Sequence, residues 1–380
     1  MKIAIINITG GGISGGYKKY LSNIIPKLVC HQDIQSLLCL SPESLHMDSW
    51  VSKGANTEFL TCPSFHFFRY RPGRKLREAL DKFAPDVIFV PIERYFRHGD
   101  IPVINMVQNT LPLLLKSMRG RPFIERLRIK VQRFDAKKAL REANWVIANS
   151  NFVKSALIRE LGISEQRISV IYFGSNLTTA DSVKPEIIPQ GWKNNFLFTA
   201  GAIELYRGLE DIIGAMRYIK ESIPNIKLVI AGPMRPKIVK YKKTLMALCR
   251  KYGLESNILW VNQLNEYEMT WCYQNCSIFI ATSRIESFGM VALEALSHGC
   301  ISVAADNPCL PEIFGDAAVY YSPRNEKMLA EKIRNVLSWD NKKREIFSRQ
   351  AKERASGFSW DVAVDKTAKV FKDAVISNLK

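Results

Sequence analysis

The sequence predicts an α/β protein with two doubly wound, Rossmann-like domains that face each other across a cleft. Short β-branched runs alternate with amphipathic helical patterns along the 380 residues, and this alternation is typical of parallel sheets covered by helices. Most runs are continuously apolar, which indicates strands buried on both faces. A polar stretch with two prolines and no periodicity, residues 179–195, separates two groups of strands.

Six strands are expected on each side of that stretch. The first six are expected at Ile3–Asn7, Leu37–Leu40, Val87–Val90, Val103–Val107, Trp145–Ala148 and Ser169–Tyr172. The second six are expected at Phe196–Ala200, Lys227–Ala231, Ile258–Val261, Ser277–Ala281, Ile301–Ala304 and Val319–Tyr321. Helices are expected to close the chain near Glu326–Leu337, Lys342–Arg354 and Asp361–Ile376. We therefore predict an N-terminal domain over residues 1–178, a linker over 179–195 and a C-terminal domain over 196–360, with the last helix (about 361–380) packing back on the first domain.

Composition excludes several classes of protein. Apolar residues make up 47% of the chain, which excludes a disordered or fibrous protein. The net charge of +18 indicates a polyanionic partner: nucleic acid, an anionic membrane or a phosphorylated ligand. Of the eight cysteines only Cys272 and Cys276 are close, without histidines at zinc spacing, so free thiols in a reducing cytosol are expected. We expect neither a signal peptide nor a membrane-spanning segment.

A glycine-rich turn follows the first predicted strand. Residues 10–16 hold five glycines, including Gly15 and Gly16, and a helix is expected from about Lys18. Glycines let backbone amides approach a phosphate, and a helix N-terminus favours an anion. The spacing departs from both the dinucleotide-binding and the Walker patterns. A plain strand-to-helix turn is the alternative.

The segment Ser283–Ala295, which follows the strand Ser277–Ala281, carries two glutamates. Gly289 indicates that Glu286 lies in the loop and Glu294 on the helix that follows. Two carboxylates beside a helix N-terminus suit a polyhydroxylated ligand that bears a phosphate, because carboxylates accept from hydroxyls while amides bind the phosphate. Two solvated glutamates on a helix are the alternative.

Several motifs together resemble the retaining glycosyltransferases of family 4, which have the GT-B fold. The resemblance is carried by Glu286-Ser287-Phe288-Gly289 with Glu294-Ala295 and Gly299, by Gly15-Gly16, Ala148–Phe152, Tyr172–Ser175, Gly201 with Arg207-Gly208, Leu228–Gly232 and Phe358-Ser359-Trp360. It spans nearly the whole chain and is most specific over Gly201–Trp360.

The resemblance implies roles for particular residues. Glu286 is implied to bind hydroxyls of the donor sugar, and Glu294 the ribose. Arg207, Gly15, Gly16 and the helix N-terminus at Met290 and Val291 are implied to neutralise the leaving diphosphate. The remaining residues of the implied donor site are Gly201, Gly232, Pro233, Gln263, Leu264, Ser287, Phe288 and Gly289. No metal and no cofactor are expected.

The chain departs from the family's pattern at two places. Ala202 stands where many members have arginine, and Arg207 where they usually have lysine, although arginine still binds phosphate bidentately. Gln108 and Asn109 follow the fourth strand, where many members have a histidine. We retain both as candidates for the active site. Capping of the strand end is their alternative role.

Two basic segments of the first domain indicate contact with an anionic membrane. In the first, aromatic and cationic residues interleave: Phe67, Phe68, Arg69 and Arg71. In the second, one stripe of a helix carries Arg126, Lys130, Arg133, Lys137 and Arg141. A solvated helix face is the alternative. Nucleic acid is not expected, because no base-reading module is recognisable.

The resemblance implies transfer of a sugar, with a preference for GDP-mannose, from a nucleotide-diphosphate donor to a glycan or lipid-linked acceptor. The expected context is the assembly of a cell-surface polysaccharide or lipopolysaccharide, at the inner face of the cell membrane. A non-catalytic nucleotide-sugar-binding protein and a GT-B sugar-nucleotide epimerase are the alternatives. A nicotinamide dehydrogenase is disfavoured by the irregular glycine spacing and the missing ribose-binding acid.

Overall fold

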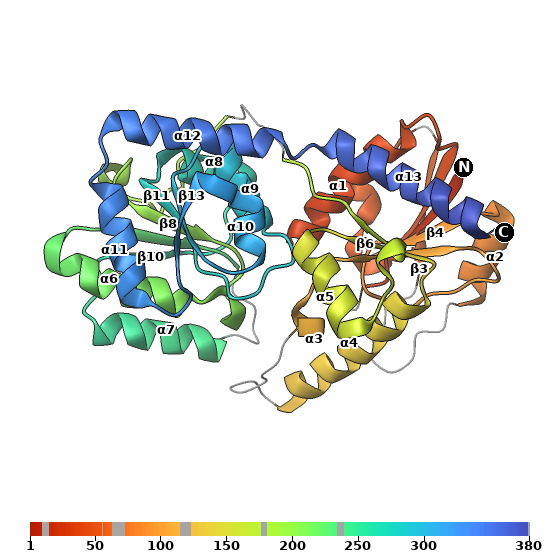
Figure 1. Ribbon diagram of the computed structural model, residues 1–380, viewed down its shortest axis with the longest axis horizontal. Coiled ribbons are helices and arrows are strands. Elements are labelled where there is room, and N and C mark those ends of the chain that lie inside the picture. Colours follow the sequence, from red (N-terminus) through yellow and green to blue (C-terminus); the bar gives the residue numbers. More distant parts are fainter. Residues whose placement is uncertain are drawn as a thin grey trace. The chain divides into compact units, whose positions relative to one another are not determined.

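The computed structural model describes residues 1–9, 15–54, 56–62, 73–114, 123–175, 181–233 and 239–378. The chain divides into two compact units, one formed by Met1–Gly174 with Ser359–Lys380 and the other by Ser175–Phe358. Each unit is an open parallel sheet with helices on it, so the predicted pair of doubly wound domains is confirmed (Figure 1).

The first unit contains a seven-stranded parallel sheet among the residues described. Its strands are β1 (Lys2–Ile6), β2 (Ser36–Pro42), β3 (Thr57–Cys62), β4 (Val87–Val90), β5 (Val103–Val107), β6 (Trp145–Ala148) and β7 (Ile168–Val170). Their order is β3-β2-β1-β4-β5-β6-β7. The winding direction therefore reverses between β1 and β4. The connections that leave the carboxyl ends of these two neighbouring strands run in opposite directions.

Strand β3 is the one that the sequence pattern missed. It pairs with β2 in parallel at the sheet edge, where Leu37 lies opposite Thr57 and Pro42 opposite Cys62. Its residues mix polar and apolar types, and Glu58 and Thr61 are exposed. An edge strand is solvated on part of its surface, so it lacks the continuous apolar run by which the other strands were recognised.

The helices of the first unit connect and cover these strands. They are α1 (Gly15–Val29), α2 (Arg74–Phe83), α3 (Leu111–Leu114), α4 (Phe123–Glu142), α5 (Asn151–Leu161) and α13 (Trp360–Asn378). Helix α13, from the end of the chain, lies beside α1, from its beginning (Figure 1). The helix expected to start near Lys18 starts at Gly15 instead, so Gly15 and Gly16 form its first turn.

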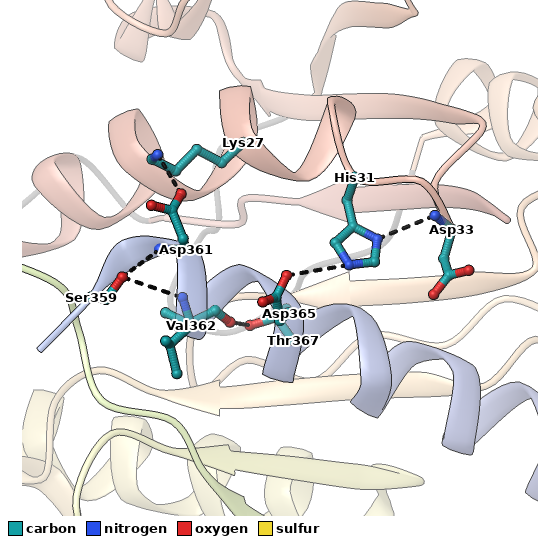
Figure 2. A network of polar contacts seen from close by, with 9 residues as sticks. Lys27, His31, Asp33, Ser359, Asp361, Val362, Asp365 and Thr367 are labelled. Carbon is teal, nitrogen blue, oxygen red and sulfur yellow. Dashed lines mark hydrogen bonds and ion pairs between the residues drawn. The ribbon is translucent and has the colours of Figure 1, made fainter. Parts of the chain in front are cut away.

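Polar contacts reinforce the packing of α13 on the first unit (Figure 2). Lys27 at the end of α1 pairs with Asp361 at 2.6 Å, and Nε2 of His31 lies 3.5 Å from Asp365. Nearby, Trp360 stacks on Phe173 with ring centroids 6.0 Å apart. The C-terminal helix is thus part of the N-terminal unit.

The second unit contains a six-stranded parallel sheet among its described residues, ordered β10-β9-β8-β11-β12-β13. The strands are β8 (Leu197–Ala200), β9 (Leu228–Ala231), β10 (Ile258–Val261), β11 (Ile278–Ala281), β12 (Ser302–Ala305) and β13 (Ala318–Tyr321). The helices are α6 (Leu209–Ser222), α7 (Val239–Lys251), α8 (Glu266–Asn275), α9 (Met290–Ser297), α10 (Cys309–Phe314), α11 (Glu326–Leu337) and α12 (Asn341–Ser356). Phe198, Tyr273 and Phe279 pack as an aromatic cluster in its core.

The stretch expected to be a linker belongs to the second unit where it is described, from residue 181 to 195. The amide of Val183 donates to the carbonyl of Tyr267 at 3.2 Å, and the amide of Asn194 donates to that of Asn275 at 2.9 Å. Ile188 is completely buried. Although its composition is polar and aperiodic, this segment is not a free connection, because backbone hydrogen bonds and the buried residues Pro185 and Ile188 hold it on the unit. None of the helices described has the length and apolar character needed to cross a membrane.

Candidate functional site

A pocket in the second unit lies where the winding direction of its sheet reverses. From β8, the chain runs outward through β9 and β10 on one side and then through β11, β12 and β13 on the other. The pocket encloses about 430 Å³ of space that opens to solvent. Its lining includes Gly201 after β8, Ala231 in β9, Ser283 and Glu286 after β11, and Val291 in α9. Open α/β sheets bind ligands in this position.

Glycines allow the strand ends at the pocket to approach one another. Gly201 has a φ of +125°, and a Cβ there would lie 2.9 Å from the guanidinium carbon of Arg207. A Cβ on Gly232 would overlap the carbonyl oxygen of Gly201. A Cβ on Gly208, whose φ is +63°, would lie 2.9 Å from Nε of Arg284. Close packing therefore requires all three glycines, and the positive φ of Gly201 and Gly208 favours glycine at these two positions as well.

Arg207 and Glu286 form an ion pair in the pocket. Nη1 of Arg207 donates to Oε1 of Glu286 and, at 3.1 Å, to the hydroxyl of Ser283. The two side chains are only 18% and 13% exposed. Burial alone would lower the pKa of Arg207, but the neighbouring Glu286 carboxylate raises it, so the guanidinium stays charged. Nε of Arg207 is buried and has no hydrogen-bond partner among the residues described.

A buried network that the sequence pattern did not indicate holds the Arg207 segment against the end of β11. The hydroxyl of Thr282 donates to the carbonyl of Arg207 at 2.6 Å. Arg284 pairs with Asp211 at 2.7 Å, and the other oxygen of Asp211 accepts from the Tyr321 hydroxyl at 3.1 Å. The 3% exposed side chain of Asp211 therefore joins α6, the loop after β11 and the end of β13. Only its position in the first turn of α6 was visible in the sequence, which gives no sign of these partners.

The loop from Glu286 to Gly289 leads into the N-terminus of α9. Gly289 has a φ of +96° and precedes Met290, the first residue of the helix. The first amides of a helix have no acceptor within it, so those of Met290 and Val291 are suited to an anion. Phe288, by contrast, directs its side chain into the core, 1% exposed and edge-on to Phe358. Ser287, between Glu286 and Phe288 in the loop, is partly exposed.

Glu294 lies one turn into α9 and contacts α8. Its Oε2 accepts a hydrogen bond from the Tyr273 hydroxyl at 3.0 Å, and Tyr273 stacks on His298 with ring centroids 5.1 Å apart. Burial and the Glu294 carboxylate both raise the pKa of Tyr273, so its phenol remains a donor. Tyr273 was not recognised from the sequence, because it lies 21 positions away, on another helix.

Gly232 and Pro233 follow β9, whereas Gln263 and Leu264 follow β10, the next strand outward. The two segments meet through the amide of Gly232, which donates to the carbonyl of Asn262 at 3.0 Å. Pro233 and Gln263 are exposed. These residues thus lie at the same carboxyl edge of the sheet as the pocket. They follow β9 and β10, which lie on the opposite side of β8 from β11.

The candidates of the first unit lie at the carboxyl edge of its own sheet. Gln108 and Asn109 follow β5, and their backbone amides both donate to Oε1 of Glu93, at 2.7 Å for Asn109. Oδ1 of Asn109 accepts from the amide of Leu111 at 3.0 Å, so this side chain does cap the start of α3. Glu93, which comes shortly after β4, was not singled out by the sequence pattern.

The candidate membrane residues are only partly described. Phe67, Phe68, Arg69 and Arg71 lie outside the described residues. The others lie on α4, where Arg126 and Lys130 are exposed and Arg133 and Lys137 are half-buried. Arg133 donates to the carbonyl of Pro112 at 2.6 Å, so this cation supports the fold. Among the residues described, no three side chains of the metal-binding types gather as a metal ion would require.

Comparison with known proteins places the chain among glycosyltransferases. Residues 184–354 match the family model for glycosyl transferases of group 1, and residues 35–178 match that for glycosyltransferase family 4. An uncharacterized glycosyltransferase of Methanocaldococcus jannaschii is 27% identical over 245 residues, which cover 62% of this chain and 61% of that protein. An O-antigen chain mannosyltransferase of Salmonella typhimurium is 22% identical over 204 residues, 54% of each chain. The matches thus span less than two thirds of these relatives.

The fold has solved counterparts as well. Anabaena HepE, crystallised with UDP and glucose, superposes with a TM-score of 0.74 over 98% of this chain and 100% of that chain, at 20% identity. This likeness concerns the fold, and the two family models together span most of the sequence. The chain therefore belongs to glycosyltransferase family 4 and has the GT-B fold.

Proposed function

We propose that the protein is a retaining glycosyltransferase that moves a sugar from a nucleotide-diphosphate donor to a glycan or lipid-linked acceptor. The observation that carries the proposal is the group formed by Arg207, Glu286 and the N-terminus of α9 around one pocket. A cation, a carboxylate and free helix amides are the set that a phosphorylated, polyhydroxylated ligand requires.

Arg207 is the proposed electrostatic catalyst. Departure of a nucleoside diphosphate leaves negative charge that protein donors must stabilise. The buried Nε of Arg207 has no partner in the described chain, and an unpaired buried donor is costly unless a ligand satisfies it. A diphosphate oxygen would satisfy this donor, while amides at Met290 and Val291 would bind a second oxygen.

Glu286 would bind hydroxyls of the donor sugar, and Glu294 the ribose, with Tyr273 orienting the Glu294 carboxylate. We assign no covalent nucleophile, because Glu286 is already paired with Arg207. Retention would follow from attack on the same face as the departing diphosphate, with a donor phosphate oxygen taking the acceptor proton. No metal and no cofactor enter this proposal.

For the donor we propose GDP-mannose. The Salmonella relative is a mannosyltransferase, whereas the Anabaena structure holds UDP and glucose. A thermal-shift series with GDP, UDP and ADP would separate the alternatives, because a nucleotide at 100 times its dissociation constant adds about 2.7 kcal/mol of stability. A larger shift in melting temperature with UDP than with GDP would overturn the assignment of GDP-mannose, but it would not contradict the proposed transferase activity.

Transfer itself is tested with a radiolabelled donor and a lipid extract as acceptor. Label appearing in a glycan or lipid product supports the transferase. Nucleotide binding with neither transfer nor donor hydrolysis would favour a non-catalytic binding protein. Conversion of the free donor into its epimer would favour an epimerase.

We further propose that α4 docks on an anionic membrane, which places the protein at the inner face of the cell membrane and fits the assembly of a cell-surface polysaccharide. Phe123, Leu127 and Phe134 are 78%, 44% and 73% exposed and recur at i, i+4 and i+11, on one line of the helix. The buried residues Ile129 and Ala136 come two positions after Leu127 and Phe134, on the opposite side.

A row of cations accompanies this apolar line. Arg126, Lys130 and Lys137 each come three positions after one of the three apolar residues, so they flank the line along the helix. Near an anionic surface each such cation contributes about 1 kcal/mol of binding free energy. A helix that combines exposed aromatic residues with flanking cations is typical of interfacial binding.

Sedimentation with vesicles of phosphatidylcholine, with and without phosphatidylglycerol, tests the membrane proposal. We expect binding only to the anionic vesicles, and loss of most of it in Lys130→Gln/Lys137→Gln and in Phe123→Ser/Phe134→Ser. Lys366→Gln/Lys369→Gln on α13 removes the same charge elsewhere and serves as control. Equal binding by all variants, or a dimer in solution that only the phenylalanine variant abolishes, would overturn the assignment of α4.

A further inference from the structure

We propose that Glu93 is a positioning residue of the transferase, whose carboxylate fixes the turn that carries Gln108 and Asn109. The inference rests on the proposed function, because it assigns a purpose to a turn whose Gln108 and Asn109 are candidates for the active site of that transferase. Glu93 itself has no role in the proposed function, and it is separated by 15 positions from Gln108.

The turn depends on one carboxylate oxygen. Oε1 of Glu93 accepts from the amides of both Gln108 and Asn109, the latter at 2.7 Å. Two neighbouring amides that converge on one acceptor fix the backbone direction at the end of β5, and thus the direction in which both side chains leave it. The Asn109 side chain then accepts from Leu111, which starts α3.

The loop that carries Glu93 is itself anchored from both sides. The side-chain amide of Asn105, in β5, donates to the carbonyls of Ile92 at 2.9 Å and Arg94 at 2.8 Å. Arg94 pairs with Asp135 of α4 at 3.1 Å. The backbone on both sides of Glu93 is therefore fixed relative to β5. The carboxylate in turn fixes the position of the turn at Gln108 and Asn109.

The location is the one where open α/β sheets generally bind ligands. Glu93 follows β4, next to β1 in the sheet, at the point where the winding direction of the first unit reverses. Tyr17, at the start of α1, is a titratable group near the carboxylate, and its hydroxyl donates to Oδ1 of Asn7 at 2.8 Å. Arg94 is the nearby cation, and it is already paired with Asp135.

A partly buried carboxylate is a costly way to hold two amides. Burial raises the pKa of Glu93, although the amides of Asn109, Glu93 and Gln108 and the charge of Arg94 act in the opposite direction. A glutamine oxygen would accept the same hydrogen bonds without a partly desolvated charge. A positioning role therefore predicts that glutamine replaces Glu93 well and alanine does not.

The test compares Glu93→Ala and Glu93→Gln in the full-length protein, with Asp135→Asn as matched control for a loosened loop. We expect Glu93→Ala to lower kcat about tenfold with little change in the donor KM, and Glu93→Gln to recover most of it. Backbone hydrogen exchange over residues 108–111 should accelerate in Glu93→Ala only. Equal losses in the alanine and glutamine variants would overturn the proposal, since the charge would then act directly on a ligand.

Two further outcomes would also overturn it: unchanged exchange in Glu93→Ala, or a loss in Asp135→Asn as large as that in Glu93→Ala. Hydrogen exchange tests the contact between Glu93 and the two backbone amides directly, and it requires no catalytic turnover. A wild-type protein that protects residues 108–111 but transfers no sugar would therefore contradict the proposed function and leave the role of Glu93 as a backbone clamp intact.

Discussion

Arg207 and Glu286, 79 positions apart in the chain, form an ion pair in the pocket at the ends of β8 and β11. The Ser283 hydroxyl also accepts a hydrogen bond from Nη1 of Arg207, at 3.1 Å. The missing side chain of Gly201 leaves the space that the guanidinium occupies. The pair brings the proposed diphosphate-binding cation and the proposed sugar-binding carboxylate together before a ligand binds. Both side chains are therefore oriented in advance, which reduces the entropic cost of binding.

Arg207→Ala and Glu286→Ala should each lower kcat/KM at least about tenfold, equivalent to roughly 1.4 kcal/mol of transition-state stabilisation. Because the residues contact each other, the double variant should lose less than the sum of the two single losses. Turnover of a radiolabelled donor measures this cycle. Near-wild-type turnover in both single variants would contradict the site assignment.

Gly201→Ala should impair transfer and lower stability by about 1–3 kcal/mol, because the position has a positive φ and the new Cβ would meet the Arg207 guanidinium. Gly191→Ala is the matched control, since a Cβ there would meet no atom within 4 Å. Denaturant unfolding and turnover should both distinguish the two variants. Equal behaviour would show that the close approach at Gly201 is unimportant.

Tyr273→Phe should raise the donor KM several-fold with little change in kcat, because it removes the hydroxyl that donates to Glu294 at 3.0 Å. The ring still packs on Phe198 and Phe279, so stability should fall by only about 1 kcal/mol. Donor titration with wild type and variant measures the effect. A fall in kcat at constant KM would argue against an orienting role toward the ribose.

Asp211→Ala should destabilise the second unit by about 2–3 kcal/mol, because it removes the carboxylate nearest to the half-buried Arg284, leaving it Glu210 at 3.5 Å, and also removes the acceptor of Tyr321. Glu353→Ala breaks an exposed pair with Arg349 and should cost less than about 1 kcal/mol. Chemical denaturation measures both. A similar cost in both variants would refute the importance of the Asp211 network.

Glu93→Gln should change how stability depends on pH. The folded pKa of Glu93 is raised mainly by burial, so the folded state is most favoured below the unfolded pKa, about 4.3, and this contribution is lost as pH rises through the folded value. Relative to wild type, the glutamine variant should therefore become more stable as pH rises across that window. Denaturation midpoints at acidic and neutral pH measure the difference, and a constant difference would contradict the raised pKa.

Much of the fold follows from local pattern. The strands expected at Val87–Val90, Val103–Val107, Trp145–Ala148 and Ile258–Val261, and the helix at Glu326–Leu337, have these bounds in the structure. Burial on both faces leaves a continuous apolar run in a strand, and burial of one face leaves a helical apolar period in a helix, and both patterns are readable in the sequence.

The segment Glu286–Glu294 and its helix N-terminus were recognised in the same local way, as a loop that runs into α9. A local pattern indicates which residue types stand at a strand end, but not what they contact. Phe288 illustrates the limit, since nothing in the local pattern indicated that its side chain packs on Phe358 in the core.

The sequence by itself determined the two α/β halves, their buried strands and the polar residues that follow several of those strands. Apolar runs, helical periods and turn residues are all properties of neighbouring positions in the chain. Only the tertiary structure decided the partners: Arg207 with Glu286, Asp211 with Arg284, Tyr273 with Glu294, and Glu93 with the backbone amides of Gln108 and Asn109. The reason is the order of the strands, which brings residues 15 to 79 positions apart to one edge of a sheet.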